Sequence, residues 1–352
     1  MKILLFVDKL FGGGAERVAS ILLNHLCNKH DVTAIIFNDR QPTYPIDSRI
    51  KIQKIVVDNK IRIWHPFERL IKIHKAIKTN APDLIISFIV EQNSRVLLSN
   101  FLPKRKIIVS ERTTIQKKQS IWRLFIRHIL YRFASKVVFV SESDYKYAKW
   151  LKNKTFIYNP LSCEIINELP NREKTIVAIS SQRRWHVKGF DLLIQAWDKI
   201  AKSHPNWELQ FVGATDDNHI SNLAKSYGID NQVNFLGWSD KIDKILQTKC
   251  IYVLSSRNEG FPNSLIEAMS QGCACVAFDC KTGPNEIITD GKSGLLAING
   301  NVDDLAVKLQ RLIEDENLRQ RLSISATEEV KRFDKELIMK QWDELIQLTV
   351  DI

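Results

Sequence analysis

The sequence predicts an α/β protein made of two doubly wound, Rossmann-like domains, each built on a parallel sheet. Short runs rich in β-branched and aromatic residues alternate with segments of helical spacing along most of the chain. Proline, asparagine and charged residues interrupt this alternation between residues 159 and 174. A chain of 352 residues is also longer than one ordinary hydrophobic core supports. We therefore expect domains at residues 1–165 and 166–335.

The first half alternates strands and helices in the order that a parallel sheet requires. Strands are predicted at residues 2–7, 32–37, 50–57, 84–88, 106–109, 137–140 and 155–158. Gly13 and Gly14 belong to a triple glycine between the first strand and a helix predicted at 15–27, where backbone amides could approach a phosphate closely. The alternative is a tight turn, because these glycines do not form the GxGxxG fingerprint of dinucleotide-binding folds.

The second half repeats this architecture. Strands are predicted at residues 175–179, 207–212, 233–236, 250–254 and 273–278, and a further run follows at 293–297. Helices are predicted at residues 190–200 and 220–227, from Asn263 onward, and over the chain's last stretch.

The stretch 255–272, SSRNEGFPNSLIEAMSQG, carries the main functional pattern. It joins the strand at 250–254 to a helix, and ligands of parallel sheets bind where strands end. Asn263 is the predicted N-cap, which puts Glu267 about one turn into the helix among apolar neighbours. A buried carboxylate needs hydrogen-bond donors, and sugar hydroxyls would supply them. The alternative is that Glu267 faces solvent and Glu259 is an ordinary loop acid.

Two basic residues occupy the loop between the first strand and helix of the second half. Arg183 and Lys188, together with the helix N-terminus, would neutralise a diphosphate. They would then do the work of a divalent metal, and this loop contains no Asp-x-Asp pair to hold one. We expect neither a metal nor a cofactor.

The positive charge of the chain is concentrated in its first half. Residues 1–170 contain 29 Lys and Arg against 14 Asp and Glu, whereas the remainder contains 22 against 26. This asymmetry indicates an acidic partner for the first half: anionic lipid, a lipid diphosphate or nucleic acid. A basic surface that is simply solvated is the alternative.

Two amphipathic segments, 67–78 and 121–133, account for part of this charge. In the second, Trp122, Phe125, Ile126, Ile129 and Phe133 share one face, and arginines are interspersed. Basic residues beside exposed apolar ones are typical of helices that lie in lipid headgroups. The alternative is that both apolar faces are core.

Cysteine spacing and hydropathy exclude several classes of protein. The six cysteines form no CxxC pair, which favours a reducing compartment over a disulfide framework or a zinc site. The apolar run at residues 3–7 ends too early for a signal peptide, and no run is long enough to span a bilayer. We expect a cytoplasmic protein.

Taken together, these motifs resemble those of retaining glycosyltransferases of family GT4, which have the two-domain GT-B fold with the active site in the cleft. The resemblance covers most of the chain. Its motifs are GGGAERV, Asn159-Pro160, the loop from Arg183 to Lys188 with KGFDLLIQAW, LSSRNEGFPNSLIEAM, and FDCKTGPNEII followed by DGKSGLLA. It also implies a last helix, 336–352, that crosses back to the first domain.

The resemblance implies a role for each matching residue. Arg183 and Lys188 would bind the donor diphosphate as it leaves, and Glu259 would hold hydroxyls of the transferred sugar. Glu267 would accept hydrogen bonds from the ribose. The other donor-binding residues that it implies are Gly13, Gly14, Gly237, Trp238, Gly260, Phe261, Pro262, Asn263, Ser264 and Leu265.

One position departs from the family pattern. Many relatives carry a histidine in the first domain where this chain reads SERTT, so Glu111 and Arg112 become the acceptor-side candidates. The FDC and GP motifs at 278–284 are similar to those of bacterial polysaccharide and glycan-assembly transferases. This implies a UDP-hexose or UDP-N-acetylhexosamine donor, a lipid-linked or polysaccharide acceptor, and a peripheral position at the inner face of the cell membrane.

Three other classes stay open at this point. A GT-B epimerase acting on a nucleotide sugar would share the fold. A nicotinamide oxidoreductase would need a better dinucleotide fingerprint. A basic membrane-binding or nucleic-acid-binding protein would use the same charge, but the chain contains no recognisable nucleic-acid module and its second half is acidic. We therefore expect no nucleic-acid partner.

Overall fold

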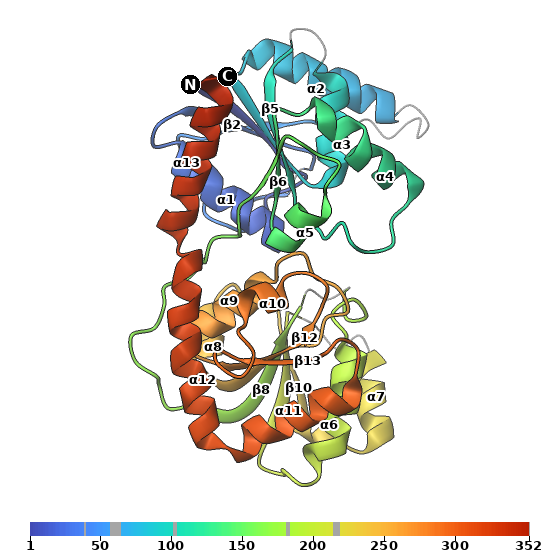
Figure 1. Ribbon diagram of the computed structural model, residues 1–352, viewed down its shortest axis with the longest axis vertical. Helices are drawn as coiled ribbons and strands as arrows, with labels where there is room; N and C mark the ends of the chain where they lie inside the picture. Colours follow the sequence, from blue (N-terminus) through green and yellow to red (C-terminus); the bar gives the residue numbers. More distant parts are fainter. Residues whose placement is uncertain (39, 57–64, 101–103, 181–183, 214–218, 352) are drawn as a thin grey trace. The chain divides into compact units, whose positions relative to one another are not determined.

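The computed structural model describes the chain except for residues 39, 57–64, 101–103, 181–183, 214–218 and 352. The chain divides into two compact units (Figure 1). The first consists of Met1–Ser162 with Lys335–Ile352, and the second of Cys163–Asp334. Each unit contains one parallel sheet with helices packed on it, so the predicted fold class is confirmed.

The described part of the first unit contains a seven-stranded sheet in the order β3-β2-β1-β4-β5-β6-β7. Its strands are β1 (Lys2–Phe6), β2 (Asp31–Ile36), β3 (Lys51–Lys54), β4 (Leu84–Phe88), β5 (Lys106–Glu111), β6 (Lys136–Phe139) and β7 (Lys154–Phe156). Its helices are α1 (Gly14–Leu26), α2 (His65–Asn80), α3 (Val90–Ser99), α4 (Ile121–His128), the 3-10 helix η2 (Leu130–Phe133), α5 (Glu142–Tyr147) and α13 (Lys335–Asp351). All seven strands were predicted, although the end of the strand predicted at 50–57 lies outside the described residues.

The last helix of the chain belongs to the core of the first unit. Ile338, Met339 and Trp342 of α13 are buried in one apolar cluster with the buried face of α1. The Trp342 ring also stacks on Phe88 at the end of β4, with ring centroids 6.4 Å apart. A second cluster fills the opposite face of the sheet and includes Ile73 of α2 and Ile126 of α4.

The second unit contains a six-stranded sheet in the order β10-β9-β8-β11-β12-β13. Its strands are β8 (Glu173–Ile179), β9 (Glu208–Val212), β10 (Val233–Gly237), β11 (Lys249–Leu254), β12 (Ala274–Asp279) and β13 (Leu295–Ile298). Its helices are α6 (Phe190–Ala201), α7 (His219–Tyr227), η3 (Asp230–Gln232), α8 (Ile242–Thr248), α9 (Asn263–Ser270), α10 (Pro284–Ile287), α11 (Val302–Glu314), α12 (Glu316–Glu329) and η4 (Val330–Phe333).

The segment 121–133 differs from the single amphipathic helix that the sequence predicts. It is divided at Ile129 into α4 and η2, and Ile126 is its one member of the predicted apolar face that is buried. The side chains of Trp122, Phe125 and Phe133 are 53%, 42% and 65% exposed. The alternative that this whole face is core is therefore wrong.

No helix in the described part of the chain is both long enough and apolar enough to cross a membrane.

Candidate active site

Lys188 and Glu259 meet at the carboxyl edge of the second sheet. Lys188 lies in the loop between β8 and α6, and Glu259 in the loop between β11 and α9. Because β8 and β11 are adjacent parallel strands, both loops leave the sheet from the same edge. The Lys188 Nζ lies 2.7 Å from Glu259 Oε1, and the two side chains are 13% and 10% exposed. The structure thus joins in one ion pair the residue expected to bind the donor diphosphate and the residue expected to hold the transferred sugar.

Backbone contacts hold these two loops tightly together. Ser255 Oγ donates a hydrogen bond to the carbonyl of Lys188 at 2.8 Å, and the Arg257 amide donates to the Val187 carbonyl at 2.9 Å. Gly189 has φ +62°, and a Cβ at this position would lie 2.0 Å from the Ser255 carbonyl oxygen. Only glycine allows this backbone conformation and this approach, so Gly189 determines where Lys188 lies.

A second ion pair beside the first was not predicted. The guanidinium of Arg257 donates two hydrogen bonds to Asp191, at 2.8 and 2.6 Å, and a third to the carbonyl of His186. This bidentate pair ties the loop before Glu259 to the first turn of α6. The available signals were the acid at the start of α6 and the arginine two residues before Glu259.

The electrostatics of the site keep Glu259 ionised. Burial alone would raise the pKa of its carboxyl group, but the attraction and hydrogen bond of Lys188 outweigh burial and lower it. Glu259 is therefore an anion that accepts hydrogen bonds from its surroundings. Its backbone carbonyl accepts a hydrogen bond from Thr282 Oγ1.

Glu267 is buried, with 6% exposure, on α9 among Leu265, Ile266 and Ala268. The alternative that it faces solvent is therefore wrong. The predicted N-cap is also wrong: α9 begins at Asn263, and Pro262 is the capping residue, with an extended backbone and no side-chain cap. Proline fixes φ near the value that it adopts here and ends the preceding loop without a polar cap.

The first turn of α9 is well ordered by local bonds. Ser264 Oγ accepts a hydrogen bond from the buried Tyr252 hydroxyl at 2.7 Å, and the Leu265 amide donates to the Pro262 carbonyl at 3.0 Å. Phe261 is buried with its ring edge against Phe333, at 5.3 Å between centroids. The predicted contacts of 260–265 with phosphate and sugar stay predictions.

Other predicted donor residues are distributed over both units. Gly237, with φ +69°, ends β10, and the adjacent Trp238 is 64% exposed; their predicted contacts with the donor stay predictions. Arg183 lies outside the described residues.

The glycine loop of the first unit has an acidic neighbour. Gly13 is the N-cap of α1 and Gly14 its first residue, and Glu16 is buried in that first turn. A Cβ at Gly13 would lie 2.0 Å from Glu16 Oε2. A carboxylate therefore already occupies the positive end of this helix. The predicted phosphate contact of Gly13 and Gly14 stays a prediction.

The two acceptor-side candidates, which are adjacent in sequence, have different environments. Glu111 ends β5 and is committed to the core: Oε2 accepts from Arg127 Nε and the Tyr131 hydroxyl, both at 2.9 Å, and Oε1 accepts from Thr113 Oγ1 at 2.9 Å. Arg112 instead stacks on Phe88, and burial lowers its pKa to about 9.

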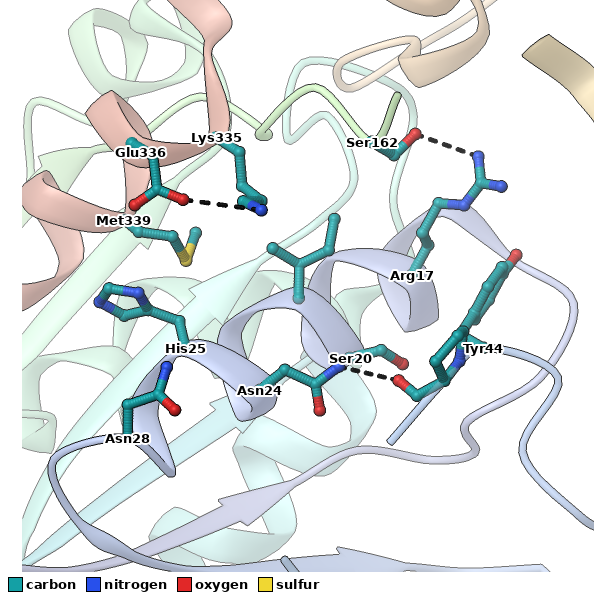
Figure 2. A pocket seen from close by; sticks show the side chains of 12 residues that line it. Arg17, Ser20, Asn24, His25, Asn28, Tyr44, Ser162, Lys335, Glu336 and Met339 are labelled. Carbon is teal, nitrogen blue, oxygen red and sulfur yellow. Dashed lines mark hydrogen bonds and ion pairs between the residues drawn. The ribbon is translucent and has the colours of Figure 1, made fainter. Parts of the chain in front are cut away.

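A pocket of about 520 Å³ lies wholly within the first unit, along α1 and the start of α13 (Figure 2). Its lining is of mixed polarity and includes none of the predicted site residues. Arg17 borders it and donates to Ser162 Oγ at 3.1 Å, and the Tyr44 hydroxyl donates to the Gly13 carbonyl at 3.3 Å. The residues around it are Arg17, Ser20, Ile21, Asn24, His25, Asn28, Tyr44, Pro45, Ser162, Lys335, Glu336 and Met339.

Each half of the chain matches a different glycosyltransferase family model. Residues 12–164 match the family model described as Glycosyltransferase Family 4, and residues 163–329 match the model described as Glycosyl transferases group 1. The amylovoran biosynthesis glycosyltransferase AmsD of Erwinia amylovora is 28% identical, over 98% of this chain and 99% of its own length.

A second relative is the GalNAc-α-(1→4)-GalNAc-α-(1→3)-diNAcBac-PP-undecaprenol α-1,4-N-acetyl-D-galactosaminyltransferase of Campylobacter jejuni. It is 28% identical, over 98% of each chain. Among solved structures, HepE of Anabaena in complex with UDP and glucose has a TM-score of 0.84, with 20% identity over 99% of each chain. The lipopolysaccharide outer core galactosyltransferase WaaB has a TM-score of 0.77, with 20% identity over 98% of this chain and 99% of its own.

Proposed function

This chain belongs to the family 4 glycosyltransferases, with the GT-B fold, and from that premise we propose that it transfers a hexose or N-acetylhexosamine from a UDP-sugar, with retention, to a lipid-linked or polysaccharide acceptor. It acts in bacterial polysaccharide, lipopolysaccharide or lipid-linked glycan biosynthesis, in common with its relatives. The ion pair between Lys188 and Glu259 is the observation that carries the finer proposal.

The donor assignment rests on chemistry and on similarity. The Campylobacter relative is an N-acetylgalactosaminyltransferase, and HepE was crystallised with UDP and glucose. In this chain, a largely buried ammonium group lies beside an ionised carboxylate at a sheet edge where ligands bind. The ammonium suits a diphosphate, and the carboxylate suits sugar hydroxyls.

The proposed mechanism is electrostatic. Cleavage at the anomeric carbon leaves negative charge on the diphosphate and positive character on the sugar. Lys188 stabilises the first, aided by the N-terminus of α6, and Glu259 holds hydroxyls of the second. Acceptor attack on the face from which the nucleotide departs gives retention. Because Lys188 and Arg183 supply the positive charge, the reaction needs no divalent metal and no cofactor.

The acceptor side includes a membrane surface in this proposal. Trp122, Phe125 and Phe133 are exposed on α4 and η2, close in sequence to the basic residues Arg123 and Arg132. Phe67 and Ile71 of α2 are 59% and 68% exposed. Such a combination favours lipid headgroups, where aromatic rings enter and cations meet anionic lipid. We propose that the first unit holds the protein peripherally at the inner membrane face.

The experiment that tests the proposal measures UDP release from a panel of UDP-sugars, with and without bacterial lipid extract. Lys188→Met and Glu259→Gln should each lower kcat by about 100-fold to 1000-fold, the range for removal of one preorganised electrostatic group. Lys199→Met is the matched control, because Lys199 lies on α6, away from the loop that holds Lys188, and forms an exposed ion pair with Asp303.

Two outcomes would contradict the proposed function. If no UDP-sugar binds or turns over, the chain is not a UDP-sugar transferase. If a UDP-sugar is converted to its isomer without release of UDP, the chain is an epimerase.

A further inference from the structure

At the carboxyl edge of the first sheet, Arg112 has a buried guanidinium edge that finds no hydrogen-bond acceptor among the described residues. The residue directly follows β5. Its Nη1 donates a hydrogen bond to Asn159 Oδ1 at 2.7 Å, whereas Nε and Nη2 are buried and have no acceptor. The N–H groups of Nε and Nη2 point the same way on the planar guanidinium, so they form a fork that matches two oxygens of one anion.

No carboxylate in the described part of the chain accepts a hydrogen bond from this guanidinium or forms an ion pair with it. Glu111, the adjacent acid, has both carboxylate oxygens committed to Arg127, Tyr131 and Thr113. Arg112 Nη1 instead donates to the neutral side-chain amide oxygen of Asn159. Burying a cation and two donors without partners is costly, so such an arrangement needs an explanation outside ordinary folding stability.

The unpaired fork is also held in a fixed orientation. The guanidinium carbon lies 4.3 Å from the ring centroid of Phe88 and 5.9 Å from that of Trp342, and Asn159 fixes the remaining corner. Ile89, which directly follows the end of the adjacent strand β4, has φ +73°, a conformation that β-branched residues rarely adopt. Backbone strain of this kind concentrates at ligand sites.

We propose that Arg112 is a phosphate-binding residue whose Nε–Nη2 edge receives two oxygens of a substrate phosphate group. The inference rests on the proposed function, because a UDP-sugar and a lipid-linked acceptor both carry a diphosphate. The shared chemistry is a phosphate with two free oxygens. Its two sources are the nucleotide of the donor and the diphosphate of the acceptor, and the experiment separates them.

The test follows the Nε–H resonance of Arg112 by NMR in the full chain labelled with ¹⁵N-arginine. Arg112→Lys identifies the resonance by its loss. We expect a saturable shift of this resonance with inorganic pyrophosphate. A further shift with UDP alone assigns the phosphate to the donor, and one with geranyl diphosphate alone assigns it to the acceptor. The Nε–H of Arg127 is the matched control, because Glu111 already occupies it.

Affinity measurements give an independent readout. Arg112→Gln should weaken binding of the anion that shifts the resonance by about 10-fold to 100-fold, the range for a lost charge-assisted hydrogen bond. Arg112→Lys should restore only part of the affinity, because an ammonium keeps the charge but not the fork. Lys188→Met in the same titration reports binding at the second unit separately.

An Arg112 resonance that stays still at saturating concentrations of all three anions would overturn the assignment. Wild-type affinity of Arg112→Gln for all three would do the same. Neither result depends on turnover, so a failure here is distinct from a failure to release UDP in the sugar-transfer assay.

Discussion

The Nε of Arg127 lies 2.9 Å from Glu111 Oε2, and these two side chains are 2% and 1% exposed. Removing one partner of such a buried ion pair strongly destabilises the folded protein, because it leaves an uncompensated buried charge. Replacing both partners with apolar residues costs much less stability. The neighbouring Arg112 differs, because it forms no ion pair with an acid in the described part of the chain.

A double-mutant cycle on this pair should show strong coupling. We expect Arg127→Met to lower the free energy of unfolding by about 3–5 kcal/mol. Arg127→Met combined with Glu111→Leu should cost clearly less than the two single changes added together. Urea unfolding gives the free energy of unfolding of Arg127→Met, Glu111→Leu and the double variant. Lys199→Met serves as a surface control, and its free energy of unfolding should stay near that of the wild type. Additive losses would show that the pair is not coupled.

Asp144 should make stability depend on pH. Burial raises the pKa of its carboxyl group to about 6 from the ordinary 3.8, despite hydrogen bonds from Gln116, Ile115 and Thr114. The folded state then binds the proton more tightly than the unfolded state. The contribution of Asp144 to stability is therefore fullest below about pH 4, and about 3 kcal/mol is lost as the pH rises through 6.

Unfolding midpoints of wild type and Asp144→Asn, compared from pH 4 to pH 7.5, measure this effect. As the pH rises, the unfolding midpoint of Asp144→Asn should increase relative to that of the wild type. A difference that stays constant over this range would mean that the pKa of Asp144 is not raised.

Gly189→Ala should lower both stability and activity. A positive φ costs an L-residue about 1–2 kcal/mol, and here the new Cβ would also collide with the Ser255 carbonyl oxygen. Gly300→Ala is the matched control, because Gly300 has φ +75° and open space around the missing Cβ. Unfolding midpoints and kcat of both variants separate the two costs. Equal losses in the two variants would argue against the collision.

Membrane association should depend on the exposed face of α4. Changing Trp122 and Phe125 to glutamine removes two large apolar side chains, each worth about 1.5–3 kcal/mol when fully buried. We expect sedimentation with anionic vesicles to fall at least tenfold. Leu348→Gln is the control, since Leu348 is 61% exposed on α13. Binding that is unchanged in the double variant, or insensitive to salt, would remove this face from the membrane proposal.

Chelation should leave the rate of sugar transfer unchanged, because Lys188 and Arg183 are proposed to supply the positive charge that a metal provides in other transferases. The measurement compares UDP release before and after EDTA treatment, and again after dialysis into Mg²⁺ or Mn²⁺. Loss of activity with EDTA and recovery with either ion would contradict the proposed roles of both side chains.

The strands and the second-unit ion pair show what local pattern can establish. Strand positions followed from short β-branched runs, because a strand buried in a parallel sheet is apolar on both faces. The meeting of Lys188 with Glu259 followed from two loops at strand ends. The sequence did not predict that the two side chains touch, because their contact depends on the close approach of the Gly189 backbone to the Ser255 carbonyl.

Other features depend on partners that sequence spacing cannot reveal. The period of 121–133 identified an apolar face, but nothing local shows whether another element covers it. Asn263 is a favoured capping residue, yet the extended backbone at Pro262 starts α9 one residue earlier. The environment of Arg112 brings together Phe88, Asn159 and Trp342, which lie far apart along the chain.

The place of α13 in the first unit has a consequence for how the protein is made. Ile338, Met339, Trp342, Leu345 and Ile346 of α13 complete a core whose other buried members come from residues 3–157. A ribosome therefore finishes the entire second unit before the core of the first is complete, and for that interval the α1 side of the nascent sheet lacks the apolar residues of α13. Biogenesis of this enzyme is thus a problem of protecting an early, incomplete domain until its final helix emerges.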